Sequence, residues 1–354
     1  MQRDKTMDVL MAIGIIYVVL GHNHQPAFIP FRAYSFHMAL FFFISGYFFK
    51  PRYGFAAKWE WLRKKATKLL VPYFSLNVIF AFLTIFLKTK NIDLGQQPSF
   101  YSLWIAPWLH GHQFTLFAPA WFVIQLFIVH IIYQNFFLKP YRLAPYLITG
   151  GLVVLAILLV NTSRTGMSRY EQIAVRTGFS LAFYSIGFLY AINKDKINRY
   201  LLQAKVLLMA LTGYGILESL CQPLTYELIW ARFLNVSPLV PFASSLLVIV
   251  IFINLARGFV ALFPQNNLVY SIGQHTFPIM CFHLTVFFGI NLILCLLGIV
   301  EYENLSHGNY RWNADHIWFI YSVPGVLIPM YVTMACKKLL QYWNTTPFRN
   351  RMAA

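Results

Sequence analysis

The sequence predicts an all-α fold, a polytopic integral membrane helical bundle of about ten transmembrane helices. Of the 354 residues, 58% are hydrophobic and only 11% are charged, whereas about 25% of the residues in a soluble globular protein are charged. Several apolar stretches approach or exceed the ~18 residues of a spanning helix. A chain of this composition lacks the polar surface to face water on all sides.

The apolar stretches give the predicted spans in order, with boundaries drawn to within ~2–4 residues. Several are short or irregular, which is typical of a bundle whose helices shelter one another. We find no internal repeat and no linker that would join a second domain, so residues 1–354 are predicted to form a single membrane domain. The spans are 7–22, 37–49, 69–88, 118–137, 143–160, 173–192, 206–221, 238–256, 271–298 and 316–336.

The distribution of Lys and Arg predicts the orientation. If the N-terminus is inside, 20 of the 28 basic residues fall in inner segments, and the positive-inside rule then places both termini in the cytoplasm. The formal charge of +17 therefore indicates orientation and not a nucleic-acid partner. No small-residue cleavage pattern follows the first apolar run, so no cleavable signal peptide is expected.

The first two spans, 7–22 and 37–49, form a hairpin whose polar hinge carries His22, Arg32 and His37. An ionisable side chain at the margin of a membrane segment has an energetic cost unless it has a partner or a function, so the hinge is a candidate site. His22 could act as a general base, because its ordinary pKa lies near neutrality. The alternative for His22 is a role in capping the end of its helix.

Three further polar residues lie in or beside later spans. Trp121 is placed near the outer interface, and Gln125 lies one turn deeper in the same span. His283 lies within the apolar run PIMCFHLTVFF, one turn after Pro278. A proline in a helix frees backbone carbonyls, so His283 either hydrogen-bonds one of them or takes part in the site.

The basic segment 50–68 allows two compatible interpretations. Its tryptophans beside Lys and Arg are typical of an interfacial helix that lies along anionic lipid headgroups. The same clustered charges could bind the phosphates of a cytosolic ligand. The residues that we expect to do so are Arg63, Lys64, Lys65 and Lys68.

Metal chemistry and several common enzyme classes are disfavoured. His22–x–His24 and His110–x–His112 lack a carboxylate or cysteine at matching spacing, and there is no HExxH, so no metal is expected. The four cysteines are scattered in or beside apolar runs without metal or redox spacing, which predicts packing roles. No phosphate-binding loop, dinucleotide fingerprint or GxSxG elbow is present.

Five stretches together resemble the acyltransferase 3 family, and within it the bacterial sugar O-acetylases of the fucose O-acetylase type. They are spread from residue 8 to about residue 290 in the family's order. They are DVLMAIGIIYVVLGH, FHMALFFFISGYFF, LRKKATKLLVPYF, PAWFVIQLFIVHIIY and SIGQHTFPIMCFHLTVFF.

The resemblance implies transfer of an acetyl group from cytosolic acetyl-CoA to a hydroxyl of a cell-envelope or exported polysaccharide, by a multi-pass protein of the inner (plasma) membrane. The acceptor would be a glycan, free or lipid-linked. The family signature is a basic residue, ten positions and then an essential histidine. His22 matches the histidine, but the basic position falls on Met11. Either Lys5, Arg32 or Arg63 supplies the charge, or this member of the family is atypical or inactive.

If the resemblance holds, His22 deprotonates the acceptor hydroxyl, and His37 orients His22 or the acceptor. Trp121 stacks on the sugar, while Gln125, His283 and Arg32 also bind substrate. Two other classes stay open. A transporter or flippase of a glycan or small solute would share the many helices, but it should show a repeat. A membrane scaffold or sensor would need no histidine cluster.

Overall fold

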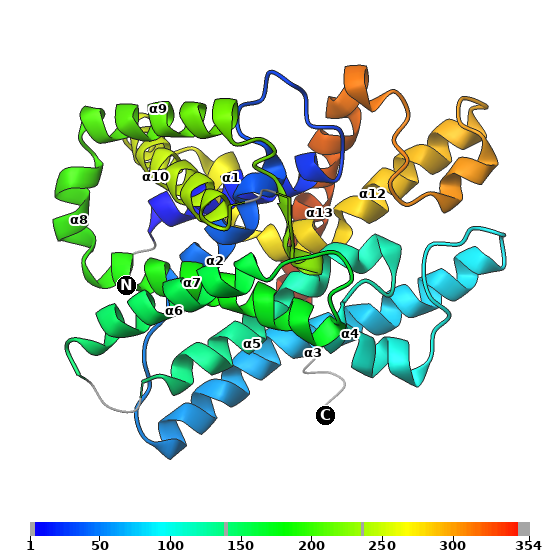
Figure 1. Ribbon diagram of the computed structural model, residues 1–354. Helices are drawn as coiled ribbons and strands as arrows, with labels where there is room; N and C mark the ends of the chain where they lie inside the picture. The colour runs from blue at the N-terminus through cyan, green and yellow to red at the C-terminus, as the bar shows by residue number, and fades with distance from the viewer. Residues whose placement is uncertain (1–3, 138–140, 235–236, 346–354) are drawn as a thin grey trace.

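The computed structural model describes residues 4–137, 141–234 and 237–345, which form helices joined by loops and one short hairpin. The long helices alternate in direction and pack into one bundle (Figure 1). The helices are α1 (Lys5–Gly21), α2 (His37–Tyr47), α3 (Phe55–Lys88), α4 (Ala106–Leu109), α5 (Trp121–Asn135), α6 (Ala144–Asn161), α7 (Arg169–Ile192), α8 (Lys194–Leu201), α9 (Ala204–Leu220), α10 (Leu239–Leu262), α11 (Asn267–Gln274), α12 (Thr276–Leu296) and α13 (Ala314–Thr345).

The all-α membrane fold is confirmed. Seven helices in the described part of the chain are long and apolar enough to cross a membrane, and an eighth span results if α8 and α9, which meet at 75°, are counted as one. The helices α1 and α2 have only 17 and 11 residues, and neighbouring helices enclose them. The count of ten and the cytoplasmic side stay predictions, and the chain ends 1–3 and 346–354 lie outside the described residues.

Local structure departs from the predicted spans in three places. The basic segment before the predicted span 69–88 is helical, but it is the first part of the continuous 34-residue α3. The predicted span 271–298 is divided at His275 into α11 and α12. A short antiparallel hairpin, β1 (Tyr226–Glu227) with β2 (Arg232–Phe233), encloses the 3-10 turn η4 (Leu228–Trp230) and lies in a region predicted to be loop.

The closest helix crossing joins α2 to α7, which lie side by side at the centre of Figure 1. A Cβ atom on Gly46 would lie 1.8 Å from the carbonyl oxygen of Tyr184, and one on Gly187 would lie 1.9 Å from that of Phe43. Only residues without a side chain permit backbones to approach so closely, as at many helix contacts in membranes. The two glycines therefore fix how deeply α2 lies in the bundle.

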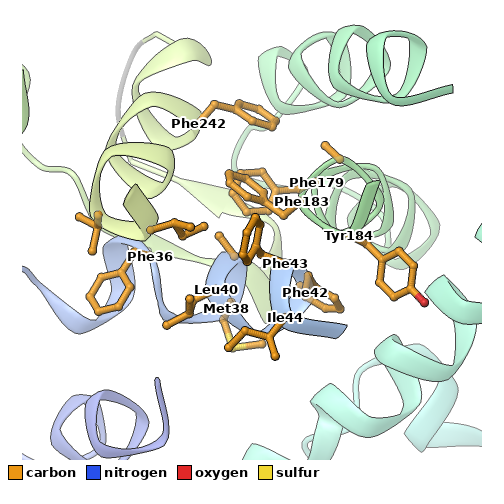
Figure 2. Packing of buried hydrophobic residues seen from close by; sticks show 14 of the residues in the cluster. Phe36, Met38, Leu40, Phe42, Phe43, Ile44, Phe179, Phe183, Tyr184 and Phe242 are labelled. Carbon is orange, nitrogen blue, oxygen red and sulfur yellow. The ribbon is translucent and has the colours of Figure 1, made fainter. Parts of the chain in front are cut away.

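Aromatic side chains fill the space around this crossing. Figure 2 shows Phe43 of α2 and Phe179 and Phe183 of α7 lying together, with Phe242 of α10 beyond them. Phe183 and Phe242 stack with ring centroids 5.6 Å apart. Tyr184 points the other way, and its hydroxyl lies 2.7 Å from His130 of α5. Contacts of this kind add specific geometry to the burial of apolar area.

A polar cluster ties α1, α2 and the α7–α8 turn together at one end of the bundle. Asp4 caps α1 by accepting from the backbone amide of Thr6. Its other carboxylate oxygen accepts from Lys194 and Tyr47, each at 2.6 Å. Burial alone would raise the pKa of Asp4, but the bonds and charge from Lys194 and Tyr47 outweigh it and hold this pKa below its ordinary value of 3.8. The cluster therefore favours the ionised carboxylate.

Later helices return to this end. Gln274, the last residue of α11, donates to Asp8 in the first turn of α1 at 3.3 Å. The next residue, His275, lies 3.5 Å from Lys337 in the final part of α13. The start of α1 and the end of α13 therefore lie on the same side of the bundle.

We expect Gly187→Ala to lower the free energy of unfolding by about 1–3 kcal/mol, because the added methyl group forces α2 away from α7. The measurement is unfolding in mixed micelles followed by circular dichroism. Gly150→Ala is the matched control, because a Cβ at Gly150 of α6 meets no atom within 4 Å. Equal stability of the two variants would show that the α2–α7 distance does not limit packing.

Asp4→Asn should cost about 0.5–1 kcal/mol at pH 7, because Asn keeps the helix cap but loses the charge that pairs with the partly exposed Lys194. The pKa of Asp4 is lowered on folding, so this contribution is complete above the ordinary pKa and is lost as the pH falls below it. Thermal unfolding of both proteins from pH 7 to pH 3 measures the difference. A gap between them that stays constant over this range would contradict the prediction.

Candidate active site

One cavity of about 560 Å³ runs through the bundle between α1, α2, α3, α5 and α12. Met11 and His22 both line it, and their separation along α1 corresponds to ~16 Å at 1.5 Å per residue. Lys65 and Lys68 of α3 lie on the wall at the end where α1 begins, and most of the remaining wall is apolar. The cavity therefore joins the two halves of the predicted site.

The opposite end of the cavity, which we call the outer end, is polar and aromatic. Four of its residues come from the connections between the long helices, and the fifth is the first residue of α5. Gly111 has φ +66°, and a Cβ atom there would lie 2.7 Å from that of Trp121, so its lack of a side chain lets the loop lie directly on α5. The residues at this end are His112, Glu227, Trp230, Asn309 and Trp121.

His22 lies on the cavity wall as the residue that ends α1. Its Nδ1 lies 2.8 Å from the carbonyl oxygen of Val18, one turn earlier. A carbonyl can only accept, so Nδ1 carries the hydrogen, and Nε2 holds the lone pair when the ring is neutral. The carbonyl thus fixes the tautomer and leaves Nε2 as the atom that can accept a proton.

His37 also lines the cavity and hydrogen-bonds the carbonyl oxygen of Ala33 through Nδ1. The ring of Tyr34 lies against both histidines, with centroids 5.2 Å from His37 and 6.2 Å from His22. The structure therefore brings the two predicted catalytic histidines to one cavity, with Tyr34 packed against each of them.

His283 lies beside His22, with ring centroids 5.0 Å apart. It is fully buried, and its Nδ1 donates to the carbonyl oxygen of Ile279 at 2.9 Å. This is the backbone bond that the sequence offered as one of two roles. The second predicted role, participation in the site, is supported by the geometry, because the His283 ring packs directly against His22, the candidate base.

Gln125 lies away from the cavity lining and holds Arg176 of α7. Its Oε1 accepts from Arg176 Nε at 2.9 Å, while its Nε2 donates to Thr177 at 3.0 Å. The remaining Arg176 donors contact the carbonyl oxygens of Trp108, Leu109 and Ile229. Arg176 thus ties the α4 end and η4 to α7. A lone arginine within a predicted span was the signal for it.

The other predicted basic residues separate into three places. Arg32 is exposed in the hinge, where its carbonyl oxygen accepts from Ser35, and it lies outside the cavity lining. Arg63 and Lys64 line a surface groove together with Lys68, which also lines the cavity. Lys65 Nζ lies 3.1 Å from His130 Nε2. Lys65 and Lys68 therefore line the end of the cavity where α1 begins, which we call the inner end, and Arg63 and Lys64 lie in the groove that shares Lys68.

Sequence reasoning missed most of the outer end, and its residues come from separate loops. Tyr34, Glu227, Trp230 and Asn309 fall in turns without apolar periodicity, and only the folded chain brings them together. The His110–Gly111–His112 segment was noticeable in the sequence, but its position over Trp121 was not predictable. Among the described residues, no three His, Cys, Asp or Glu side chains gather in a group that could hold a metal ion.

The two histidines of the loop at the outer end, His110 and His112, have lowered pKa values. Burial, together with the charges of Arg169, His112 and Arg176, lowers the pKa of His110 to about 4. Burial likewise lowers the pKa of His112. Both imidazoles are therefore neutral at pH 7.

Fold and site together define a polytopic membrane protein with a histidine-bearing cavity open to polar groups at both ends. The family model for an acyltransferase domain matches residues 4–335, and the chain belongs to the acyltransferase 3 family. The protein is therefore a membrane acyltransferase. Searches of curated proteins and of solved structures found no significant match to this chain.

Gln125→Leu should lower the free energy of unfolding by about 1–3 kcal/mol, because it leaves Arg176 Nε buried without its acceptor. Gln125→Glu, which keeps an acceptor, should retain most of the stability. Thermal unfolding in detergent compares the three proteins. Unchanged stability of Gln125→Leu, together with weaker substrate binding, would favour the substrate contact predicted from the sequence.

Proposed function

We propose that this acyltransferase moves an acetyl group from cytosolic acetyl-CoA to a hydroxyl of a cell-envelope or exported polysaccharide at the inner membrane. The observation that supports this function best is the cavity itself, which His22 lines together with Lys65 and Lys68. A donor with phosphates at one end and a reactive thioester at the other matches a cavity that is basic at one end and carries a base near the other.

The donor fits the shape and chemistry of the inner half. The pantetheine arm is long and thin, and the walls along the ~16 Å between Met11 and His22 are formed largely by apolar side chains. The phosphates would lie among four basic side chains, Arg63, Lys64, Lys65 and Lys68. Lys68 lines both the cavity and the neighbouring surface groove, so the two spaces meet there. Several lysine and arginine donors around one entrance are well suited to phosphate oxygens.

The acceptor side follows from the outer end. Trp121 and Trp230 offer flat apolar faces for a sugar ring, and Asn309 and Glu227 line the same space with polar groups. The sugar hydroxyl would lie against His22 Nε2, the atom left free by the Val18 bond. His37 and Tyr34 would orient the acceptor, and His283 would fix the plane of the His22 ring.

The chemistry is general-base acyl transfer. His22 Nε2 takes the proton from the sugar hydroxyl as its oxygen attacks the thioester carbonyl carbon. The tetrahedral intermediate then collapses, the carbon–sulfur bond breaks, and the CoA thiolate leaves. The imidazolium returns the proton to the sulfur, so the products are an O-acetyl ester and the free thiol of CoA.

His22→Ala should lower the rate of acetyl transfer by about 10²–10⁴-fold, the usual contribution of a positioned base. Transfer is measured with labelled acetyl-CoA and purified protein in nanodiscs. Envelope polysaccharide from cells that carry each variant is examined for O-acetyl signals by NMR. His24→Ala is the control, because the His24 side chain is exposed and pairs with Asp315 at the surface.

Retention of the wild-type rate by folded His22→Ala would remove His22 from the mechanism. Failure of the wild-type protein to consume acetyl-CoA, with an unchanged glycan in a deletion strain, would overturn the proposed function.

A further inference from the structure

Two arginines lie behind the cavity wall near its outer end without a carboxylate partner, Arg176 buried and Arg311 half-buried. Arg176 of α7 has only 3% of its surface exposed. Arg311 lies in the loop between α12 and α13. In the described chain, which includes all the Asp and Glu residues, neither arginine lies within 4.0 Å of a carboxylate oxygen. Glu227, the carboxylate on the cavity wall, pairs with Arg232 at 3.1 Å.

The backbone on both sides of Arg311 is held in place. Asn291 of α12 donates to the carbonyl oxygen of Tyr310 at 3.0 Å, and the amide of Trp312 donates to the hydroxyl of Tyr321 at 3.0 Å. Tyr321 in turn donates to Asn291 at 2.6 Å. Buried polar networks of this kind fix one conformation, so Arg311 has a defined position.

The guanidinium of Arg311 is only partly satisfied. Its Nη1 donates to the carbonyl oxygens of Gly308 and Tyr310, and its Cζ lies 4.6 Å from the ring centroid of Phe287. Its Nε and Nη2 are buried without a hydrogen-bond partner among the described residues. Burial lowers the pKa of Arg311 to about 10, so the group is still charged at neutral pH.

Arg311 lies directly behind the reaction site. The Phe287 ring packs against that of His283, with centroids 5.7 Å apart, and His283 packs against His22. Asn309, two residues before Arg311, is on the cavity wall. In a water-poor interior a charge acts over a longer range than in water, and a cleft with charges of one sign concentrates ligands of the opposite sign.

We propose that the acceptor is an anionic sugar, one that bears a carboxylate or a phosphate group, and that Arg311 with Arg176 supplies the charge that selects it. The inference rests on the proposed function, because it names the acceptor class of the same site. A buried cation without a counter-ion is energetically costly, and an anionic acceptor in the outer end would provide the missing opposite charge. Trp121 and Trp230 would hold the sugar ring beside it.

The test measures binding separately from transfer. Protein in nanodiscs is titrated by calorimetry at low salt with methyl glucuronide, glucose 1-phosphate and methyl glucoside. We expect the two anionic probes to bind on the order of tenfold more tightly than the neutral glucoside. A preference for only one of the two anionic probes identifies whether the carboxylate or the phosphate is recognised.

Arg311→Gln should reduce this preference to near one, while Arg311→Lys, which keeps the charge, should retain it. Arg164→Gln is the matched control, since this arginine is 65% exposed and pairs with Glu171 at the same end. If Arg311→Gln fails to fold, the wild-type preference should still decrease between 50 and 500 mM salt.

Equal binding of anionic and neutral probes, or a preference that Arg311→Gln keeps, would overturn the inference even if acetyl transfer is confirmed. A preference that depends on Arg311, in a protein that does not consume acetyl-CoA, would support the anion site and reject the proposed function instead.

Discussion

The arrangement of this bundle depends on the backbone contact between α2 and α7. Gly46 and Gly187 let the two helices approach until each glycine lies against a carbonyl of the other helix. The helix α2 has only 11 residues and is too short to span a bilayer by itself. It therefore needs close contact with a neighbouring helix to be enclosed in the bundle. The contact places His37 at the cavity and directs Tyr184 to His130. A site residue in α2 is therefore positioned by packing that lies several residues away from the chemistry.

The two ends of the cavity use positive charge in different ways. The inner end holds Lys65, which lies 3.1 Å from His130, and Lys68, which also lines a surface groove. A groove at this end suits a ligand that enters from water. The outer end has arginines held by carbonyl oxygens and an aromatic ring, which suits fixed recognition because a guanidinium has a rigid geometry. His22 and His37 line the same cavity. This order of groups gives the cavity a direction along which a donor and an acceptor can meet.

The sequence was sufficient for the membrane class, because composition and apolar length are averaged over many residues. It also pointed to His22, His37, Lys65 and Lys68, which adjoin apolar runs where a polar group is conspicuous and which the structure places on one cavity wall. It could not predict the contributions of Glu227 and Trp230, since a hairpin of two-residue strands between α9 and α10 is too short to show periodicity. The partner of Gln125 could not be predicted for a different reason. The sequence places Gln125 in its own helix, but Arg176, which it binds, belongs to another helix.

Met11 shows how the structure changes the meaning of a missing charge. The family signature has a basic residue at this position, and Met11 does line the cavity. Lys5, one of the substitutes expected from the sequence, donates instead to the carbonyl oxygen of Pro264, and Arg32 is exposed in the hinge. The basic side chains that share the cavity wall with Met11 are Lys65 and Lys68 of α3. Since an electrostatic interaction depends on distance and not on sequence position, a charge on α3 can act on the same ligand as one on α1.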